Sequence, residues 1–307
     1  MIVSLGEALI DRIHGEDGTE PTTQIGGSPY NVAIALSRLE IDAGFVCPLS
    51  SDPHGDLLFA GLQANGVHLC CSTRVEAPTA IAEVFRDENG HPRYVFHRDK
   101  TADRALLESP PKSALPVKLE ALHFGSLVLA QEKDWPAWRD AIQHARSQGT
   151  FIAFDPNLRI KLIDDMNGYV KRLEEAIALS DLIKASDEDL SLLKPGSTPN
   201  EQIQKWCAPG RLVVLTEGKA GAQLWGSNGL HATFRDTPTG PIVDTVGAGD
   251  TFQAALLAWL SKHSAFSQDL RSETAHALLR FASHAAFLNC TQEGCQPPTL
   301  TQVQQSL

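Results

Sequence analysis

The sequence predicts an α/β fold in which helices cover both faces of a mainly parallel sheet. Short β-like runs alternate with helical patterns along most of the 307 residues, as in proteins built on such sheets. Within 248–262, apolar residues recur at every third or fourth position, which is the spacing of a helix that packs one face on a sheet. The stretches 12–25 and 80–99 do not fit the alternation and predict a small extra sheet.

The predicted elements follow in order along the chain. The strands are 1–9, 44–49, 119–124, 151–154, 182–185 and 212–216, and the helices include 28–39, 134–147, 168–180 and 248–262. Ser28 is expected to be the N-cap of the first helix, with Pro29 at its first helical position. In the second irregular stretch, residues 88–90 predict a turn between two alternating arms. The chain has no internal repeat or Pro/Ser-rich linker, so a single domain spanning 1–307 is expected.

Composition and charge exclude several classes of protein. With 42% hydrophobic and 21% charged residues, the chain can bury a sizeable core. Its 26 Lys and Arg residues against 37 Asp and Glu residues give a net charge of −11 with no basic cluster, so neither nucleic acid nor an anionic membrane is an expected partner. The longest apolar run, 254–260, is too short to cross a bilayer, and the N-terminus lacks the basic segment of a secretory signal. A cytoplasmic location is therefore expected.

Cysteines and histidines give no sign of a metal site in the sequence. The six cysteines form no C-x-x-C pair, and the vicinal Cys70 and Cys71 are poorly placed for a disulfide. The 11 histidines are scattered without an H-E-x-x-H spacing. Buried free thiols are therefore expected in place of a zinc site.

The strongest motif is DTVGAGDTF, residues 244–252, at the start of the predicted helix 248–262. Backbone N–H groups at a helix N-terminus carry partial positive charge, and Gly247, Ala248 and Gly249 leave room for a phosphate group to approach them. Asp250, in the first turn, is placed to take a proton from an acceptor hydroxyl, as a kinase base does. An aspartate also simply favours a helix start, so this motif alone leaves both interpretations open.

A second glycine motif, GGSPYNVA at 26–33, opens another predicted helix. Its glycines let a ligand approach the backbone at Gly27, and Asn31 offers a donor and acceptors for sugar hydroxyls. Ordinary loop-to-helix chemistry accounts for the same residues when the motif is taken alone. Rival nucleotide motifs are incomplete: Ala220 follows Gly-Lys where a P-loop needs Ser or Thr, and Phe252 stands where a dinucleotide-binding motif needs its last glycine.

With both motifs in this order, the sequence resembles the ribokinase-like (PfkB) carbohydrate kinases over essentially its full length. GGSPYNVA resembles the N-terminal signature of the family, and DTVGAGDTF resembles its C-terminal signature. The resemblance implies a ribokinase-like three-layer α/β/α sandwich with a mainly parallel sheet, and a small β-sheet lid over the sugar formed by about 12–25 and 80–99. Within the family, the segments that look most like fructokinases are GEALID (6–11), HFGS (123–126), FDPNLR (154–159) and KASDEDL (184–190).

The resemblance also implies roles for individual residues. It makes Asp250 the base, and the backbone of Gly247, Ala248 and Gly249 the anion hole for the transferred phosphoryl group. The residues that it places at the sugar are Asp11, Gly27, Asn31, Arg98 and Arg159. Arginine offers several fixed donors to a substrate or a phosphate, although a surface salt bridge would account equally well for Arg159.

The nucleotide and metal sites are implied in the same way. TEGKAG (216–221) resembles the loop that contacts ATP phosphate and ribose, and 282–286 resembles the segment that flanks adenine. The implied nucleotide-binding residues are Lys184, Thr216, Gly218, Gly221, Gly249 and Ser283. Asp189 would order water bound to Mg²⁺, although the acidic residues at 187–189 also suit the first turn of any helix. Asp244 and Thr245 match a site for a monovalent cation, which would be K⁺.

The activity implied by the resemblance is transfer of the γ-phosphoryl group of ATP, with Mg²⁺, to the 6-hydroxyl of fructose. Alternative acceptors are 2-keto-3-deoxygluconate, ribose and a nucleoside; an acceptor with a carboxylate would need cationic partners such as His97 and Arg98. An alternative of another class is a sensor that binds sugar or nucleotide without catalysis, but such a protein needs neither Asp250 nor the glycine loop. The open edges of a lid sheet predict a homodimer through the lid.

Overall fold

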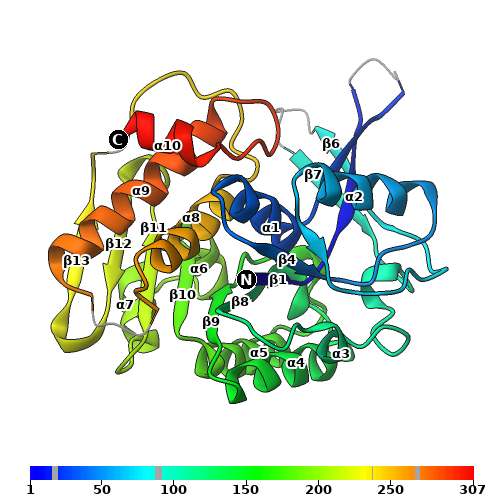
Figure 1. Ribbon diagram of the computed structural model, residues 1–307, viewed down its shortest axis with the longest axis horizontal. Helices are drawn as coiled ribbons and strands as arrows, with labels where there is room; N and C mark the ends of the chain where they lie inside the picture. The colour runs from blue at the N-terminus through cyan, green and yellow to red at the C-terminus, as the bar shows by residue number, and fades with distance from the viewer. Residues whose placement is uncertain (16–19, 87–91, 237, 267–269) are drawn as a thin grey trace.

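The computed structural model describes residues 1–15, 20–86, 92–236, 238–266 and 270–307, which form a three-layer α/β/α sandwich and a separate small sheet (Figure 1). In the described residues the main sheet has nine strands, in the order β13-β12-β11-β10-β9-β8-β1-β4-β5. The pairs from β11 to β5 are parallel, whereas β12 and β13 pair antiparallel at one edge. The strands are β1 (Ile2–Leu5), β4 (Ala43–Val46), β5 (His68–Leu69), β8 (Ala121–Gly125), β9 (Phe151–Asp155), β10 (Leu182–Ser186), β11 (Leu212–Thr216), β12 (Ala222–Trp225) and β13 (His231–Phe234).

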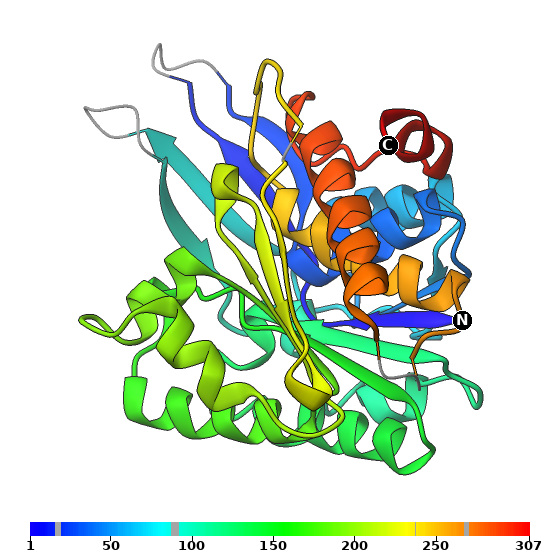
Figure 2. The ribbon, with the colours of Figure 1, turned by 90° about the vertical axis from the view of Figure 1, so that its left-hand side faces the viewer.

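Helices cover both faces of the main sheet, as Figures 1 and 2 show. One face packs against α1 (Ser28–Arg38), α2 (Pro53–Ala64), α8 (Ala248–Lys262), α9 (Ser272–Cys290) and α10 (Leu300–Ser306). The other packs against α3 (Pro111–Ala114), α4 (Trp135–Ser147), α5 (Met166–Leu179), α6 (Asp187–Leu193) and α7 (Pro199–Trp206). Strand side chains alternate between the two cores: in β9, Ala153 faces the first, and Ile152 and Phe154 face the second. Strands buried on both faces have the continuous apolar runs that the sequence shows.

The small sheet has the strand order β3-β2-β6-β7 and stands apart from the main sheet, with its blue and cyan strands at the upper left of Figure 2. Its strands are β2 (Leu9–Ile13), β3 (Thr22–Gly26), β6 (Ala80–Arg86) and β7 (Pro92–His97). The two irregular stretches predicted to form an extra sheet do so. The antiparallel pairing of β6 with β7 confirms the two arms predicted around 88–90, and the turn itself lies outside the described residues.

The first predicted strand, 1–9, is wrong as a single element, because the chain leaves the main sheet after β1 and enters the small sheet with β2. The break falls at residues 6–8, where Gly6 has a φ of 146°. Glu7 is buried at this crossing, and its carboxylate accepts hydrogen bonds from the backbone N–H groups of Ser28 and Leu127, each at 3.3 Å. Apolar residues on both sides of the crossing explain why the run looks continuous in sequence.

The helix predictions need three corrections. Helix α8 has the predicted bounds, but it packs between α1 and α9 and is buried on every side from Asp250 to Leu260, so a single apolar stripe is too narrow a description. Helix α5 begins at Met166, two residues before the prediction, because the Asp165 side chain caps it. The N-cap of α1 is Gly27, which places Ser28 inside the helix. The structure adds α2, α3, α6, α7, α9 and α10 to the predicted helices.

None of the described helices has both the length and the apolar character needed to cross a membrane.

Candidate active site

The N-terminus of α8 is set by Gly247, the N-cap, whose left-handed backbone has φ 75° and ψ 0°. A side chain at this position would be strained and would collide with the sulfur of Cys295. The Thr251 N–H donates to the Gly247 carbonyl at 2.8 Å, so Gly249 and Asp250 lie in the first turn. The N–H groups of a first turn mostly lack partners inside their own helix, and they provide an anion with donors and a favourable dipole.

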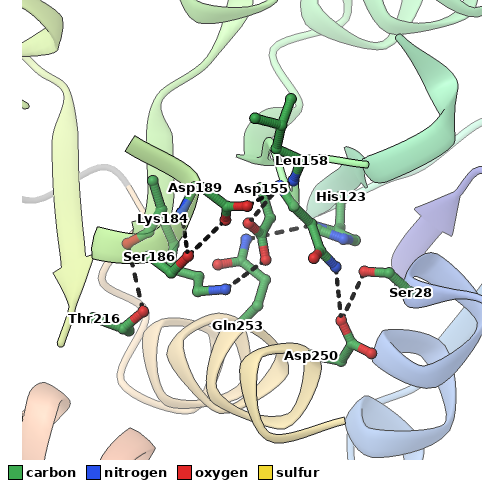
Figure 3. A network of polar contacts seen from close by, with 12 residues as sticks. Ser28, His123, Asp155, Leu158, Lys184, Ser186, Asp189, Thr216, Asp250 and Gln253 are labelled. Carbon is green, nitrogen blue, oxygen red and sulfur yellow. Dashed lines mark hydrogen bonds and ion pairs between the residues drawn. The ribbon is translucent and has the colours of Figure 1, made fainter. Parts of the chain in front are cut away.

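The carboxylate of Asp250 accepts hydrogen bonds from three side chains. Asp250 Oδ1 accepts from Ser28 Oγ at 2.7 Å and from Asn157 Nδ2 at 3.4 Å, and Oδ2 accepts from Asn31 Nδ2 at 2.8 Å. Figure 3 shows Ser28 directed at Asp250 from the neighbouring helix. The two glycine motifs identified in the sequence, 222 residues apart at Ser28 and Asp250, therefore meet at one carboxylate. Ser28 does not cap α1 as predicted; its hydroxyl orients Asp250 instead.

Gly27 leads into α1 with φ 112° and ψ 124°, a conformation that side chains disfavour. A Cβ here would lie 2.6 Å from the carbonyl oxygen of Glu7, so glycine lets the start of α1 press against the crossing between β1 and β2. The buried Glu7 anchors this contact, and burial raises the pKa of its carboxyl above the ordinary value. The close packing of α1 on this crossing therefore requires glycine at position 27 whether or not a ligand binds there.

Asp11 extends the site onto the small sheet. It lies on β2, pairs in register with Gln24 of β3, and its carboxylate covers Gly26. Burial raises the pKa of Asp11 to about 6, and the positive charge of Arg159 offsets part of this effect. Arg159 itself is exposed, and its Nη1 donates to Asn157 Oδ1 at 2.6 Å. Asp11, Asn31, Arg159 and Asp250 are therefore linked by direct bonds or by charge around one region.

Arg98 has a different environment from the other residues predicted to bind the sugar. Its side chain is buried, and its Nε donates to Asp103 at 2.6 Å. Burial alone would lower the pKa of Arg98, but the carboxylates of Asp103 and Glu7 raise it. This internal ion pair accounts for a charged side chain inside the protein, and a contact between Arg98 and substrate stays a prediction.

Lys184, in the middle of β10, and Asp155, at the carboxyl end of β9, form a buried ion pair with 2.6 Å between Nζ and Oδ2 (Figure 3). The two side chains are only 4% and 1% exposed. Burial by itself would lower the pKa of Lys184, but the carboxylates of Asp155, Asp189 and Asp250 together raise that pKa above its ordinary value. A Cβ added to Gly249 would lie 3.1 Å from Lys184 Nζ, so the ammonium group faces the first turn of α8. A fixed positive charge is thus held beside the predicted anion hole.

The other residues predicted to bind nucleotide lie on the β11–β13 side of the main sheet and on α9. Thr216 ends β11, and its hydroxyl donates to the Ala185 carbonyl at 3.4 Å. Gly218 begins a short 3-10 turn before β12, and Gly221 directly follows that turn. Gly221 lies against the carbonyl of Phe234. Ser283 is buried within α9. The structure places these residues at the end of β11, in the turn that follows it and on α9, which packs on β12 and β13, and their contacts to nucleotide stay predictions.

The predicted metal residues are all engaged by the protein. Asp189 Oδ1 accepts from the Leu158 N–H and Oδ2 accepts from Ser186 Oγ, each at 2.8 Å. Asp244 Oδ1 accepts from the Val246 N–H at 3.0 Å and Oδ2 accepts from the Gly294 N–H at 2.9 Å, while the Thr245 carbonyl accepts from the Ala248 N–H. Across the described part of the chain, no group of three or more His, Cys, Asp or Glu side chains is arranged to hold a metal ion.

Three residues of this site were not predicted from the sequence to belong to it, since Ser28 was expected only as a helix cap. Asn157 and Ser28 donate to Asp250, and Asp155 pairs with Lys184. Asp155 and Asn157 belong to FDPNLR, a segment that resembles fructokinases. Asp155 is the last residue of the central strand β9, and Asn157 follows two residues later. Polar residues where parallel strands end are the signal that could have identified them, because ligands bind along that edge of open α/β sheets.

Carbohydrate kinases are among the known proteins that this chain resembles. The profile of the pfkB family carbohydrate kinases matches residues 1–302. The chain is 34% identical to a fructokinase of Rhizobium leguminosarum bv. trifolii, over 85% of this chain and 79% of that protein, and 31% identical to probable fructokinase-4 of Arabidopsis thaliana, over 100% and 96%. A crystal structure of fructokinase with bound ATP from Xylella fastidiosa has a TM-score of 0.86 at 26% identity, covering 99% of this chain and 97% of that one. The chain therefore belongs to the pfkB family of carbohydrate kinases.

Proposed function

We propose that this carbohydrate kinase transfers the γ-phosphoryl group of ATP to the 6-hydroxyl of fructose, with Asp250 as the base. The observation that carries the proposal is the place of Asp250, which joins the N-terminus of α8 to the side chains of Ser28, Asn31 and Asn157. A base for phosphoryl transfer must reach the acceptor hydroxyl beside the anion hole, and the place of Asp250, in the first turn of α8 and bonded to Asn31, supports this role. The fructokinases among its relatives support fructose as the acceptor.

On the acceptor side, the proposed sugar ligands are Asp11, Gly27, Asn31 and Arg159. Carboxylate, amide and guanidinium groups together offer acceptors and donors to several hydroxyls, and the backbone at Gly27 can be approached closely. The small sheet carries Asp11, so we propose that it acts as the lid and excludes water that would otherwise compete as acceptor. Its edge strands, β3 and β7, are the proposed surface for a homodimer.

On the donor side, the backbone N–H groups of Gly247, Ala248 and Gly249 are proposed to hold the transferred phosphoryl group, with the Ala248 N–H exchanging its 3.2 Å bond to the Thr245 carbonyl for one to phosphate. The ammonium of Lys184 would stabilise the same group, because it faces Gly249. The proposed contacts to the rest of ATP come from Thr216, Gly218, Gly221 and Ser283.

Magnesium fits this site as an ion carried by the phosphates. Magnesium usually binds to proteins through substrate phosphates, waters and one or two carboxylates. It therefore does not need three acidic, histidine or cysteine side chains around it, and no such group occurs among the described residues. When bound, it supplies positive charge that neutralises the phosphate oxygens. Asp189 remains the proposed partner of a magnesium-bound water, and the loop at Asp244 and Thr245 remains the proposed K⁺ site.

The proposed compartment is the cytoplasm. The use of ATP as donor and the six free cysteines support it, because thiols stay reduced there.

The test is release of ADP in a coupled assay with Mg²⁺-ATP and a panel of fructose, ribose, 2-keto-3-deoxygluconate and adenosine. Turnover that depends on fructose is expected, with kcat/KM for fructose at least tenfold above that for any other acceptor. Faster turnover with 2-keto-3-deoxygluconate would keep the kinase chemistry and change the acceptor to one that carries a carboxylate. Absence of turnover with every acceptor would contradict the proposal.

Binding of fructose is expected to weaken as the pH falls below about 6. Burial raises the pKa of Asp11 to about 6, so this carboxylate loses its charge over a range in which most carboxylates keep theirs. An ionised carboxylate accepts hydrogen bonds from sugar hydroxyls better than a neutral one. Between pH 7 and pH 5, KM for fructose should rise by up to about tenfold while KM for ATP stays constant, since about nine-tenths of Asp11 is protonated at the lower pH.

The control for this pH dependence is Asp11→Asn, whose KM for fructose should be high and flat over the same range. Because the affinity for ATP is measured in the same titration, a general loss of structure at low pH would be recognised by a parallel rise in both KM values. A wild-type KM for fructose that does not change between pH 7 and pH 5 would remove Asp11 from the sugar site.

A further inference from the structure

Asn157 has an unusual backbone conformation beside Asp250. It lies two residues after β9, and its φ of 36° is positive although it is not glycine. Such conformations are uncommon and persist where surrounding contacts impose them, often at functional sites. The contacts of Asn157 therefore show what this conformation achieves.

Both ends of the Asn157 side chain are used. Its Oδ1 accepts a hydrogen bond from Arg159 Nη1 at 2.6 Å, and its Nδ2 donates to Asp250 Oδ1 at 3.4 Å. Its backbone N–H donates to Asp155 Oδ1 at 3.2 Å, on the carboxylate that also binds Lys184. Asn157 thus connects an exposed guanidinium, the buried ion pair and the proposed base. The bond to Asp250 is the longest of these, as is common for catalytic hydrogen bonds before substrate binds.

The segment that carries Asn157 is also fixed from its other side. The backbone N–H of the next residue, Leu158, donates to Asp189 Oδ1 at 2.8 Å, and Ser186 Oγ holds the other oxygen of Asp189 (Figure 3). Leu158 itself is buried in the core on the α5 face of the sheet. The amide of Asn157 therefore reaches Asp250 from a segment that follows β9 and is also anchored to the start of α6.

The two oxygens of Asp250 are used unequally. An ionised carboxylate has about four acceptor sites, two on each oxygen. Oδ1 receives Ser28 and Asn157, which fills it, whereas Oδ2 receives Asn31 and keeps one acceptor site among the contacts of the described residues. An incoming hydroxyl would therefore meet Oδ2.

We propose that Asn157 is a positioning residue that, with Ser28, occupies Oδ1 of Asp250 and so presents Oδ2 to the acceptor hydroxyl. This inference rests on the proposed function. In the reaction the O–H bond of the sugar breaks and its proton passes to Oδ2, the sugar oxygen bonds to the γ-phosphorus, and the bond from that phosphorus to the bridging oxygen breaks, leaving ADP with the electron pair. Asn157 moves no proton; it fixes the direction from which the base acts.

Two substitutions separate this role from a backbone role. Asn157→Gly tolerates the positive φ but removes the amide, and we expect kcat to fall about ten- to a hundredfold with KM for ATP unchanged. Asn157→Asp keeps an oxygen for Arg159 and also tolerates the backbone, but it places a negative charge beside Asp250. We expect Asn157→Asp to lower kcat and to move the acid limb of the kcat–pH profile upward by about one pH unit or more. The other ionisable groups that interact with Asp250, Lys184, Asp155 and Cys295, are unchanged in both variants.

The matched control is Asn228→Asp, which alters another asparagine with positive φ, 58°, on an exposed turn between β12 and β13. Its kcat and pH profile should equal those of the wild type. The proposal is overturned if both Asn157 variants keep wild-type kcat, or if they raise KM for fructose at unchanged kcat, which would make Asn157 a sugar ligand only.

The failure of this inference can be told apart from failure of the proposed function. If the wild type phosphorylates no sugar, the function is wrong, and the crystal structure of Asn157→Gly then decides the positioning role. An Asp250 carboxylate that turns away from Ser28 and Asn31 in that variant supports the inference. A carboxylate that keeps both bonds overturns it.

Discussion

Replacing Asp250 by alanine is expected to lower kcat by about two to four powers of ten while the protein stays folded. The carboxylate lies at the first turn of α8 and is the meeting point of Ser28, Asn31 and Asn157, so its loss removes the proton acceptor without removing the elements that surround it. Positioning of the two substrates would remain, which is why some turnover should survive. The measurement is steady-state release of ADP with saturating fructose and ATP, beside circular dichroism and thermal melting.

Asp250→Asn and Ser28→Ala are the controls that make this result specific. The asparagine keeps the shape of the side chain but is not a base, so its kcat should be as low as that of the alanine variant. Ser28→Ala removes the other donor to Oδ1 and leaves the base, so its kcat should fall about ten- to a hundredfold, as in Asn157→Gly, and by less than in Asp250→Ala. A folded Asp250→Ala protein with full turnover would assign the proton transfer to another group.

The sequence predicted the parts of the fold that depend on local pattern. Strand β11 and helix α8 have their predicted bounds, because a continuous apolar run and a helical repeat are both local signals. The boundary between β1 and β2 was not predictable in this way, since apolar residues continue through the crossing and only the tertiary contacts of Glu7 mark it. Helix α9 was missed although it has 19 residues, because Ser283, His284 and Asn289 interrupt the apolar residues that it buries.

The candidate site shows the same division. Asp250 and Asn31 could be predicted because each lies in a glycine motif whose chemistry can be read from neighbouring residues. Ser28 and Asn157 could not be assigned to Asp250, because their bonds span 222 and 93 residues. A serine beside a helix start also has a simpler interpretation as a cap, and the structure overturned that interpretation by turning its hydroxyl toward the base. Pairing across such distances is decided by strand order, which a single sequence does not contain.

Removing the charge of Lys184 with Lys184→Met is expected to lower the free energy of unfolding by about 3–5 kcal/mol. Lys184 and Asp155 are almost fully buried, so loss of the ammonium group leaves the buried carboxylate of Asp155 without its counter-charge. The measurement is equilibrium unfolding in urea. Lys112→Met is the matched control, because Lys112 pairs with Asp140 at 3.3 Å in an exposed position, and exposed pairs contribute at most about 1 kcal/mol.

The double variant Lys184→Met/Asp155→Asn separates stability from catalysis. It removes both buried charges and keeps an oxygen for the Asn157 N–H, so most of the lost stability should return. Turnover should not return, because Lys184 Nζ faces Gly249 and we expect it to stabilise the transferred phosphoryl group. Full recovery of both stability and turnover would show that the ion pair serves the fold alone. A single variant as stable as the wild type would show instead that the carboxylate of Asp155 needs no buried partner.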